Sequence, residues 1–195
     1  MATKQPFFDA GQHADPATPS PIGTIVRMVA VVAAAVGLSW LITTFIVHPY
    51  EVPSGSMETT IMTGDKVFSE KVSYYFRDIE PGDIVTFDDK EIPGRVLLKR
   101  CIAVGGQTIE LIDGKVVVDG VALDEPYTHG LPSDPFARTL ADITYPYTVP
   151  EGEIWVMGDN RTNSQDSRYF GAIETSSVTG RVCLVYWPFN NFSVL

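Results

Sequence analysis

Histidine is scarce in this chain of 195 residues, and the positions of its three histidines restrict the chemistry that it can perform. His13 precedes a long apolar segment, His48 follows that segment directly, and His129 lies in a proline-rich stretch. A hydroxyl nucleophile needs a base, and histidine is the usual one. These positions argue against a histidine-based catalytic triad, so lysine is the remaining common base for a serine nucleophile.

Cysteine is equally scarce, and no cluster of residues has the spacing of a metal site. Cys101 and Cys183 lie in apolar, strand-like segments. In an exported domain they can form one disulfide, but free cysteines also pack in cores, and both possibilities stay open. The segment 158–168, in which two Asp alternate with two Arg, does not fit a calcium loop, because Arg161 and Ser164 stand where acidic residues or glycine are needed. We expect neither a metal nor a cofactor.

Positive charge is low as well. The chain has 14 Lys and Arg against 24 Asp and Glu, a net charge of −10, and the two basic and two acidic residues before His48 cancel. The whole excess therefore belongs to residues 48–195, which argues against nucleic acid as a partner and against electrostatic docking on anionic lipid. Contact of these residues with membrane lipid would have to be apolar. The aromatic groups around Trp187 and Tyr74 suit a membrane interface or a core.

The chain does contain one long apolar segment. Met28–Val47 has 20 uncharged residues, enough at 1.5 Å per residue to cross a hydrocarbon core of about 30 Å. It is longer than the apolar part of a cleaved signal, and no small-residue cleavage site follows it. We therefore expect an uncleaved, single-pass transmembrane anchor at residues 28–47.

The orientation of this anchor follows from the positive-inside bias. Lys4 and Arg27 precede the apolar segment, whereas the 18 residues from His48 to Asp65 contain no Lys or Arg. This asymmetry predicts a cytoplasmic N-terminus in the cell membrane and an extracytoplasmic domain at residues 48–195. Residues 1–27, rich in Pro, Ala, Thr and Gly, are expected to form a disordered cytoplasmic tail.

Residues 48–195 have the pattern of β structure. Short segments rich in Val, Ile and aromatic residues alternate with turn signals such as Asp113-Gly114, and no useful helical period appears after residue 48. The pattern predicts an all-β domain of coiled sheets or a barrel. The expected strands are 66–75, 83–87, 95–104, 108–112, 115–118, 154–157 and 181–187. Five prolines in residues 124–150 indicate, with the preceding hairpin, an inserted excursion at about 108–150.

Three segments carry candidate chemistry. Pro53-Ser54-Gly55-Ser56-Met57 is either a tight turn that presents a nucleophilic serine or simply a turn. Lys99 lies in the apolar run 96–104, where burial would lower its pKa to suit a general base. Strand alternation can equally point Lys99 to solvent. Residues 158–168, dense in Asp, Asn, Ser and Arg, suit a hydrogen-bonded loop over a site or a solvated turn.

In this order, the segments resemble the bacterial type I signal peptidases, the membrane-bound Ser–Lys proteases of family S26 that remove signal peptides. The resemblance covers about residues 50–188 and implies coiled antiparallel β sheets with a barrel-like part, as in signal peptidases and LexA. The matching segments are Val52-Pro53-Ser54-Gly55-Ser56-Met57, Pro81-Gly82-Asp83-Ile84-Val85, Leu98-Lys99-Arg100 and Gly158-Asp159-Asn160-Arg161 with Ser164, Asp166, Ser167 and Arg168. The four motifs in register behind an apolar segment make the resemblance specific.

The resemblance also implies a role for each matching residue. Ser56 would be the nucleophile and Lys99 the general base, with the Ser54 hydroxyl and the Ser56 N–H as the oxyanion hole. Ser164 would orient the Lys99 amine. Asp159, Asp166 and Arg168 would brace the loop, and the shallow pockets that admit only small side chains of the signal peptide would be lined by Val52, Leu98, Tyr50 and Thr86. The chain departs from the family pattern at Thr59, Cys101, Gly105 and Gln107, which puts local turn geometry in doubt.

Two other functions deserve comparison with this one. A self-cleaving regulator of the LexA kind would use the same Ser–Lys pair, but the apolar segment argues against it. A non-catalytic anchored domain that binds exported proteins would lack Ser56 or Lys99, and both are present. The sequence therefore favours a membrane-anchored serine endopeptidase, a hydrolase of protein secretion that acts on signal peptides of exported preproteins.

Overall fold

The computed structural model of the chain describes residues 21–195, which divide into a helical unit and a β domain. The helix α1 covers Pro21–Phe45, and its stretch Pro21–Thr43 is long and apolar enough to cross a membrane. It begins seven residues before the expected anchor, because one charged residue, Arg27, does not end a helix and proline suits its first turn. Residues 21–27 are thus helical, whereas residues 1–20 of the expected tail lie outside the described residues.

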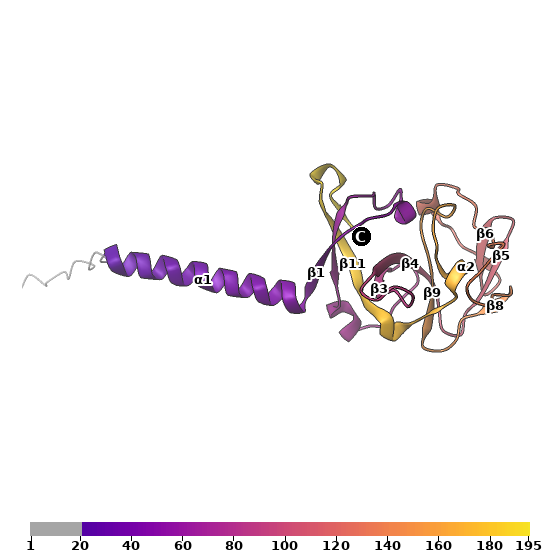
Figure 1. Cartoon of the computed structure of the whole chain (residues 1–195), viewed down its shortest axis with the longest axis horizontal. Coiled ribbons are helices and arrows are strands. Elements are labelled where there is room, and N and C mark those ends of the chain that lie inside the picture. The colour runs from indigo at the N-terminus through magenta and orange to yellow at the C-terminus, as the bar shows by residue number, and fades with distance from the viewer. Residues whose placement is uncertain (1–20) are drawn as a thin grey trace, which may run out of the picture. The chain divides into compact units, whose positions relative to one another are not determined.

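The β domain is built on one large antiparallel sheet, in the order β1-β2-β11-β3-β4-β9-β10, with β12 paired to β11. Figure 1 shows this sheet curling around its own interior, so the expectation of coiled antiparallel sheets is confirmed. Its strands are β1 (Val47–Glu51), β2 (Lys66–Glu70), β3 (Ile84–Asp88), β4 (Val96–Val104), β9 (Glu153–Met157), β10 (Ile173–Glu174), β11 (Val178–Trp187) and β12 (Ser193–Val194).

The excursion forms a smaller sheet of its own, in the order β7-β6-β5-β8. Its strands are β5 (Thr108–Ile112), β6 (Lys115–Val118), β7 (Val121–Ala122) and β8 (Tyr147–Thr148). The predicted hairpin is present: Ile112 pairs with Lys115, and both turn residues, Asp113 and Gly114, have positive φ, as a two-residue turn of this kind requires. The proline-rich remainder, between Leu123 and Pro146, has no strand in the structure.

Helical structure after residue 48 is confined, in the described chain, to short turns. They are α2 (Ser167–Phe170) and the 3-10 turns η1 (Gly55–Met57), η2 (Val72–Tyr75), η3 (Pro126–Thr128), η4 (Thr175–Ser177) and η5 (Phe189–Asn191). One expected strand, 66–75, ends early for this reason. The Glu70 carboxylate accepts hydrogen bonds from the Ser73 N–H at 2.9 Å and from its hydroxyl at 2.6 Å, which favours the turn η2 over a longer strand.

The core consists of three apolar clusters, two of which support the segments of interest. Val52, Met57, Ile61 and Val67 belong to the cluster beneath the turn that carries Ser56. A second cluster, around Cys101 and Val156, holds β3, β4 and β9 together, and the third joins β9 to the small sheet. Both flanks of the 53–57 turn are thus buried, which places its serine on a rigid support.

Candidate active site

Ser56 and Lys99 meet in the interior of the β domain. Ser56 lies in the turn η1 and Lys99 in the middle of β4, and both side chains are buried, Lys99 with only 3% exposure. The Lys99 Nζ donates a hydrogen bond of 2.7 Å to the Ser56 Oγ. The structure therefore answers the question that strand alternation left open, because Lys99 points inward, to the serine.

The surroundings of Lys99 change its acidity. Burial penalises the charged ammonium and lowers the pKa of Lys99 to about 8, against the opposing effect of the Asp166 carboxylate. Arg95 lowers this pKa further and Asp159 raises it. The pKa of Lys99 therefore lies close to neutral pH, so that a useful fraction of the amine is neutral and can accept a proton.

The loop at residues 158–161 holds the Ser56 turn in place. The Asn160 backbone N–H donates to the Ser56 carbonyl at 3.0 Å, and the Asn160 side-chain amide donates to the Gly55 carbonyl at 2.9 Å. Gly158 lies so close that an added Cβ would be 2.4 Å from the Ser56 carbonyl oxygen and 2.3 Å from Ser164 Oγ. Only glycine lets the loop approach the turn this closely.

Ser54 lies at the mouth of the site, two residues before Ser56. Its side chain is exposed, and its Oγ is 3.5 Å from the Ser56 Oγ. The predicted donor pair, the Ser54 hydroxyl and the Ser56 N–H, thus belongs to one short turn.

The structure brings the predicted bracing residues together in two buried ion pairs. Arg168 donates to Asp166 through Nε and Nη2, at 2.9 Å each, and Asp166 also accepts from the Gly158 N–H at 3.0 Å. Asp159 accepts from Arg100 at 2.8 and 2.6 Å. Asp159 also accepts a hydrogen bond of 2.5 Å from the Thr60 hydroxyl, which connects the segment after Ser56 to the same loop. The two ion pairs thus hold the loop at Gly158 in place.

Ser164 is near the site but lacks its predicted contact. Its side chain is buried and lines the same cavity as Lys99. Among the described residues, however, its Oγ has no hydrogen-bond partner, so the predicted hydrogen bond to the Lys99 amine is absent here. The Lys99 Nζ instead donates to Ser56.

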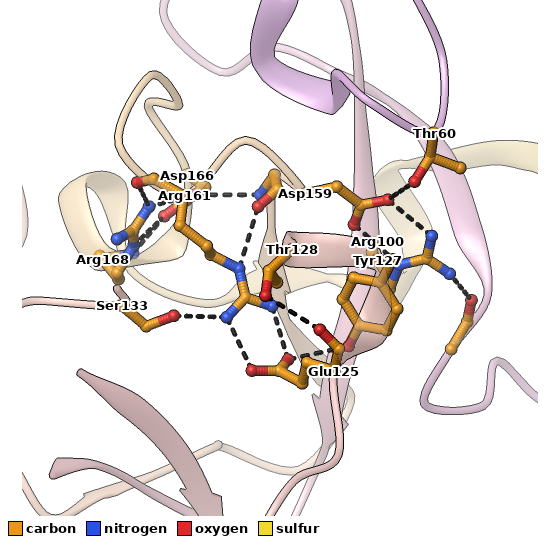
Figure 2. A network of polar contacts seen from close by, with 12 residues as sticks. Thr60, Arg100, Glu125, Tyr127, Thr128, Ser133, Asp159, Arg161, Asp166 and Arg168 are labelled. Carbon is orange, nitrogen blue, oxygen red and sulfur yellow. Dashed lines mark hydrogen bonds and ion pairs between the residues drawn. The ribbon is translucent and has the colours of Figure 1, made fainter. Parts of the chain in front are cut away.

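A second polar network was not predicted from the sequence (Figure 2). Arg161, whose side chain is fully buried, donates to the Glu125 carboxylate at 2.8 and 2.5 Å and to the Ser133 hydroxyl at 2.5 Å. Tyr127 donates 2.8 Å to Glu125, and its ring lies 4.0 Å from the Arg100 guanidinium. The excursion is therefore joined to the loop 158–161 by an ion pair and by hydrogen bonds. The only sequence signal was the unusual length of the excursion, which says nothing of its partners.

The four residues predicted to line a substrate pocket do share one cavity. Tyr50, Val52, Thr86 and Leu98 lie around a cavity of about 240 Å3 that also touches Ser56 and Lys99. Thr86 is a buried member of this lining, and its hydroxyl is 2.8 Å from that of Ser69 and accepts from Thr179 at 2.9 Å.

Neither cysteine is in a disulfide, which resolves the alternative left open by the sequence. Cys101 is buried and Cys183 half-buried, and burial raises the pKa of the Cys101 thiol to about 12. Within residues 21–195, no group of three or more His, Cys, Asp or Glu is placed to hold a metal ion.

Comparisons with known proteins give a consistent result. A model of the family described as "Signal peptidase, peptidase S26" matches residues 25–187. The probable signal peptidase I-1 of Synechocystis is 34% identical over 184 residues, 91% of this chain and 90% of that protein. The signal peptidase I of Mycobacterium tuberculosis is 31% identical over 231 residues, 93% of this chain and 79% of that protein. A solved signal peptidase I from Enterococcus faecalis is 32% identical with a TM-score of 0.45, over 54% of this chain and 97% of that one.

Proposed function

We infer the mechanism from one premise: the chain belongs to the signal peptidase family, peptidase S26, and is a serine protease that cleaves signal peptides. On this premise we propose Ser56 as the nucleophile and Lys99 as the general base. The observation that carries the proposal is the 2.7 Å hydrogen bond between the two side chains in a buried site. A serine hydroxyl becomes a nucleophile when a base is held within hydrogen-bond distance of it.

The proposed reaction has two stages. In the first, the neutral Lys99 amine takes the Ser56 proton while Oγ attacks the scissile carbonyl carbon. The resulting oxyanion accepts hydrogen bonds from the Ser56 N–H and the Ser54 hydroxyl, and the Lys99 ammonium then protonates the departing amine of the mature protein. In the second, Lys99 deprotonates a water that attacks the acyl carbon. The bond from this carbon to the Ser56 Oγ then breaks, Oγ takes the proton back from the Lys99 ammonium, and the signal peptide leaves with a new carboxylate.

The lowered pKa of Lys99 makes this chemistry feasible near neutral pH. With a pKa of about 8, roughly one amine in ten is neutral at pH 7, compared with fewer than one in a thousand for an ordinary lysine.

We assign Ser164 to the stage at which Lys99 is charged. Once Ser56 has lost its proton to Lys99 and bonded to substrate, the ammonium needs another acceptor, and the unpaired, buried Ser164 Oγ in the same cavity suits this role. Asp159, Asp166 and Arg168 support it indirectly, because their ion pairs hold the loop that carries Ser164.

The cavity of about 240 Å3 supports the proposed preference for small side chains. It is bounded by Tyr50, Val52, Leu98 and Thr86 and opens at Ser56, so residues of the signal peptide just before the scissile bond would occupy it. Its volume is less than half that of the neighbouring cavity of about 550 Å3, which supports a preference for small side chains.

The helix α1 and the family fit a membrane-anchored protein. We propose that α1 is a single-pass anchor in the cell membrane, with the N-terminus cytoplasmic and the β domain outside. The positions of Lys4 and Arg27 support this orientation. The partners would be signal peptides of exported preproteins and membrane lipid, and the net negative charge of residues 48–195 argues against nucleic acid.

The direct test is preprotein processing by the full chain in detergent. We expect Ser56→Ala and Lys99→Ala each to lower kcat at least about 10³-fold, because each removes half of a unit that acts together. The matched controls are Ser176→Ala and Lys115→Ala, which change exposed residues outside the site. Processing by either dyad variant at the wild-type rate would refute the mechanism.

A further inference from the structure

Two cavities meet at the reacting residues, and only the smaller has a proposed occupant. The larger, of about 550 Å3, is also lined by Ser54, Ser56 and Lys99. It contains none of the four residues proposed to bind the small side chains of the signal peptide. The nucleophile therefore lies at the junction of two cavities that extend to different parts of the domain.

A peptide bound across this junction must use both sides of Ser56. Attack on its carbonyl places the residues before the scissile bond on one side of Ser56 and the residues after it on the other. If Tyr50 and Val52 bind residues before the bond, the larger cavity is the space left for the first residues of the mature protein.

The larger cavity has the walls of a built site. Its floor is apolar, with the buried Phe87 and Ile173, and one wall is formed by Phe136 and Leu140 of the excursion. This wall contacts the short helix α2, which follows Ser164 in the chain. The Leu140 N–H donates 2.8 Å to the Tyr169 carbonyl, and the Phe136 and Tyr169 rings meet edge to face at 6.3 Å.

The turn between β3 and β4 forms another part of the lining, and hydrogen bonds hold its shape. Asp89 accepts from the Glu91 N–H at 2.7 Å and forms an ion pair with Arg95. Leu140 leaves 55% of its surface exposed and lines the same cavity as Ser56 and Lys99. An exposed leucine in such a place is available to bind an apolar side chain.

The structure assigns this larger cavity as a subsite for the mature-protein side of the substrate, one that takes a bulky apolar side chain among the first residues after the scissile bond. This assignment rests on the proposed function, since the smaller cavity must bind the signal-peptide side. It makes Leu140 a specificity-determining residue of the excursion.

The test is a positional scan with the full chain in detergent. One signal peptide is followed by an all-alanine segment in which a single leucine occupies each of the first five positions in turn, and kcat/KM is measured for each substrate. We expect leucine at one or two positions to raise kcat/KM about tenfold over alanine, as for extra methylene groups in an apolar pocket. In Leu140→Asp this ratio should fall to about one.

The matched control is Val121→Asp, a change at another exposed apolar residue of the excursion that lines neither cavity. It should retain the leucine preference. The readout is the ratio of kcat/KM for the leucine and alanine substrates, so a smaller folded fraction of the variant does not affect it. Leu140→Ala should give a ratio between those of the wild type and Leu140→Asp.

The outcomes separate this inference from the proposed function. A flat scan, in a wild-type protein whose cleavage depends on Ser56, would overturn the subsite and leave the mechanism intact. A leucine preference that Leu140→Asp does not change would also overturn it, as would a Leu140→Asp effect confined to leucines before the scissile bond. Cleavage that persists in Ser56→Ala would refute the proposed function, and the subsite with it.

Discussion

Lys99 shows how the surroundings of one residue decide its chemistry. On the solvent face of β4 it would be an ordinary charged lysine. Facing inward, it donates to Ser56 and loses hydration, and this loss of hydration lowers its pKa. The opposing carboxylates of Asp166 and Asp159 prevent a larger fall, which leaves the value at about 8. The site thus balances desolvation against nearby negative charge.

This balance predicts the pH dependence of processing. In the proposed mechanism the reactive form of Lys99 is the neutral amine, so we expect protonation to remove activity as pH falls through about 8. We expect kcat/KM to fall about tenfold per pH unit between pH 7 and pH 5.5 and to level off above about pH 9. Initial rates on one preprotein across pH 5 to 10 would measure this. Constant activity from pH 9 to pH 5 would contradict a lysine base, provided that circular dichroism shows the protein folded throughout.

The excursion is an element whose role comes from its contacts with the loop 158–161. Through Glu125 it pairs with the buried Arg161, while Tyr127 lies against Arg100, the partner of Asp159 (Figure 2). The same loop donates from Asn160 to the Ser56 carbonyl. The excursion can therefore influence the position of the nucleophile without touching it.

Neutralising Glu125 tests this influence. Glu125→Gln keeps the shape but leaves the buried Arg161 charge without its ion-pair partner, so we expect unfolding in urea to show a loss of about 3 to 5 kcal/mol in the free energy of unfolding. Because the loop positions Ser56, kcat should fall several-fold with KM nearly unchanged. The pH midpoint of activity should stay near that of the wild type, since Lys99 keeps its surroundings.

The control for this prediction is the neighbouring Asp124→Asn, which neutralises an exposed carboxylate of the same excursion. It should leave both stability and kcat unchanged. If Glu125→Gln loses stability but keeps its kcat under conditions where it is folded, the network is a scaffold and does not position the nucleophile.

The elements of the fold were predictable to different degrees. The hairpin at Asp113-Gly114 was predictable because two adjacent turn residues determine its geometry. The prediction that strand 66–75 continues past Glu70 was wrong, because Glu70 accepts hydrogen bonds from Ser73 and so favours a turn. A pattern of apolar residues does not reveal such a local hydrogen bond. The short strands β7, β8, β10 and β12 have two residues each and exist only because a neighbouring strand pairs with them.

At the scale of the whole molecule, charge and the apolar helix together define how the protein would sit at a membrane. The −10 charge of residues 48–195 disfavours attraction to anionic lipid, so attachment would depend on α1 and on apolar contact. Among the described residues of the β domain, Tyr75, Phe76 and Phe189 are exposed aromatic side chains available for such contact. The aromatic residues near both Tyr74 and Trp187 thus include members outside the core.

The proposed orientation can be measured by cysteine labelling in cells. A membrane-impermeant maleimide should label Val121→Cys in intact cells, because this exposed position belongs to the β domain. Lys4→Cys should be labelled only after lysis. The wild type, which has a buried Cys101 and a half-buried Cys183, gives the background level of maleimide labelling. The reverse labelling pattern would invert the topology.

The sequence by itself determined the apolar helix and the all-β class and predicted Ser56 and Lys99 as partners, because each inference depends on local composition or on a short motif. Only the tertiary structure decided that Lys99 faces Ser56, that the cysteines stay apart, that Ser164 lacks its expected partner and that Glu125 neutralises Arg161. Those outcomes depend on strand register and on packing between segments far apart in the chain. Whether a strand residue points inward or outward is set by what covers each face of the sheet, which a local pattern does not specify.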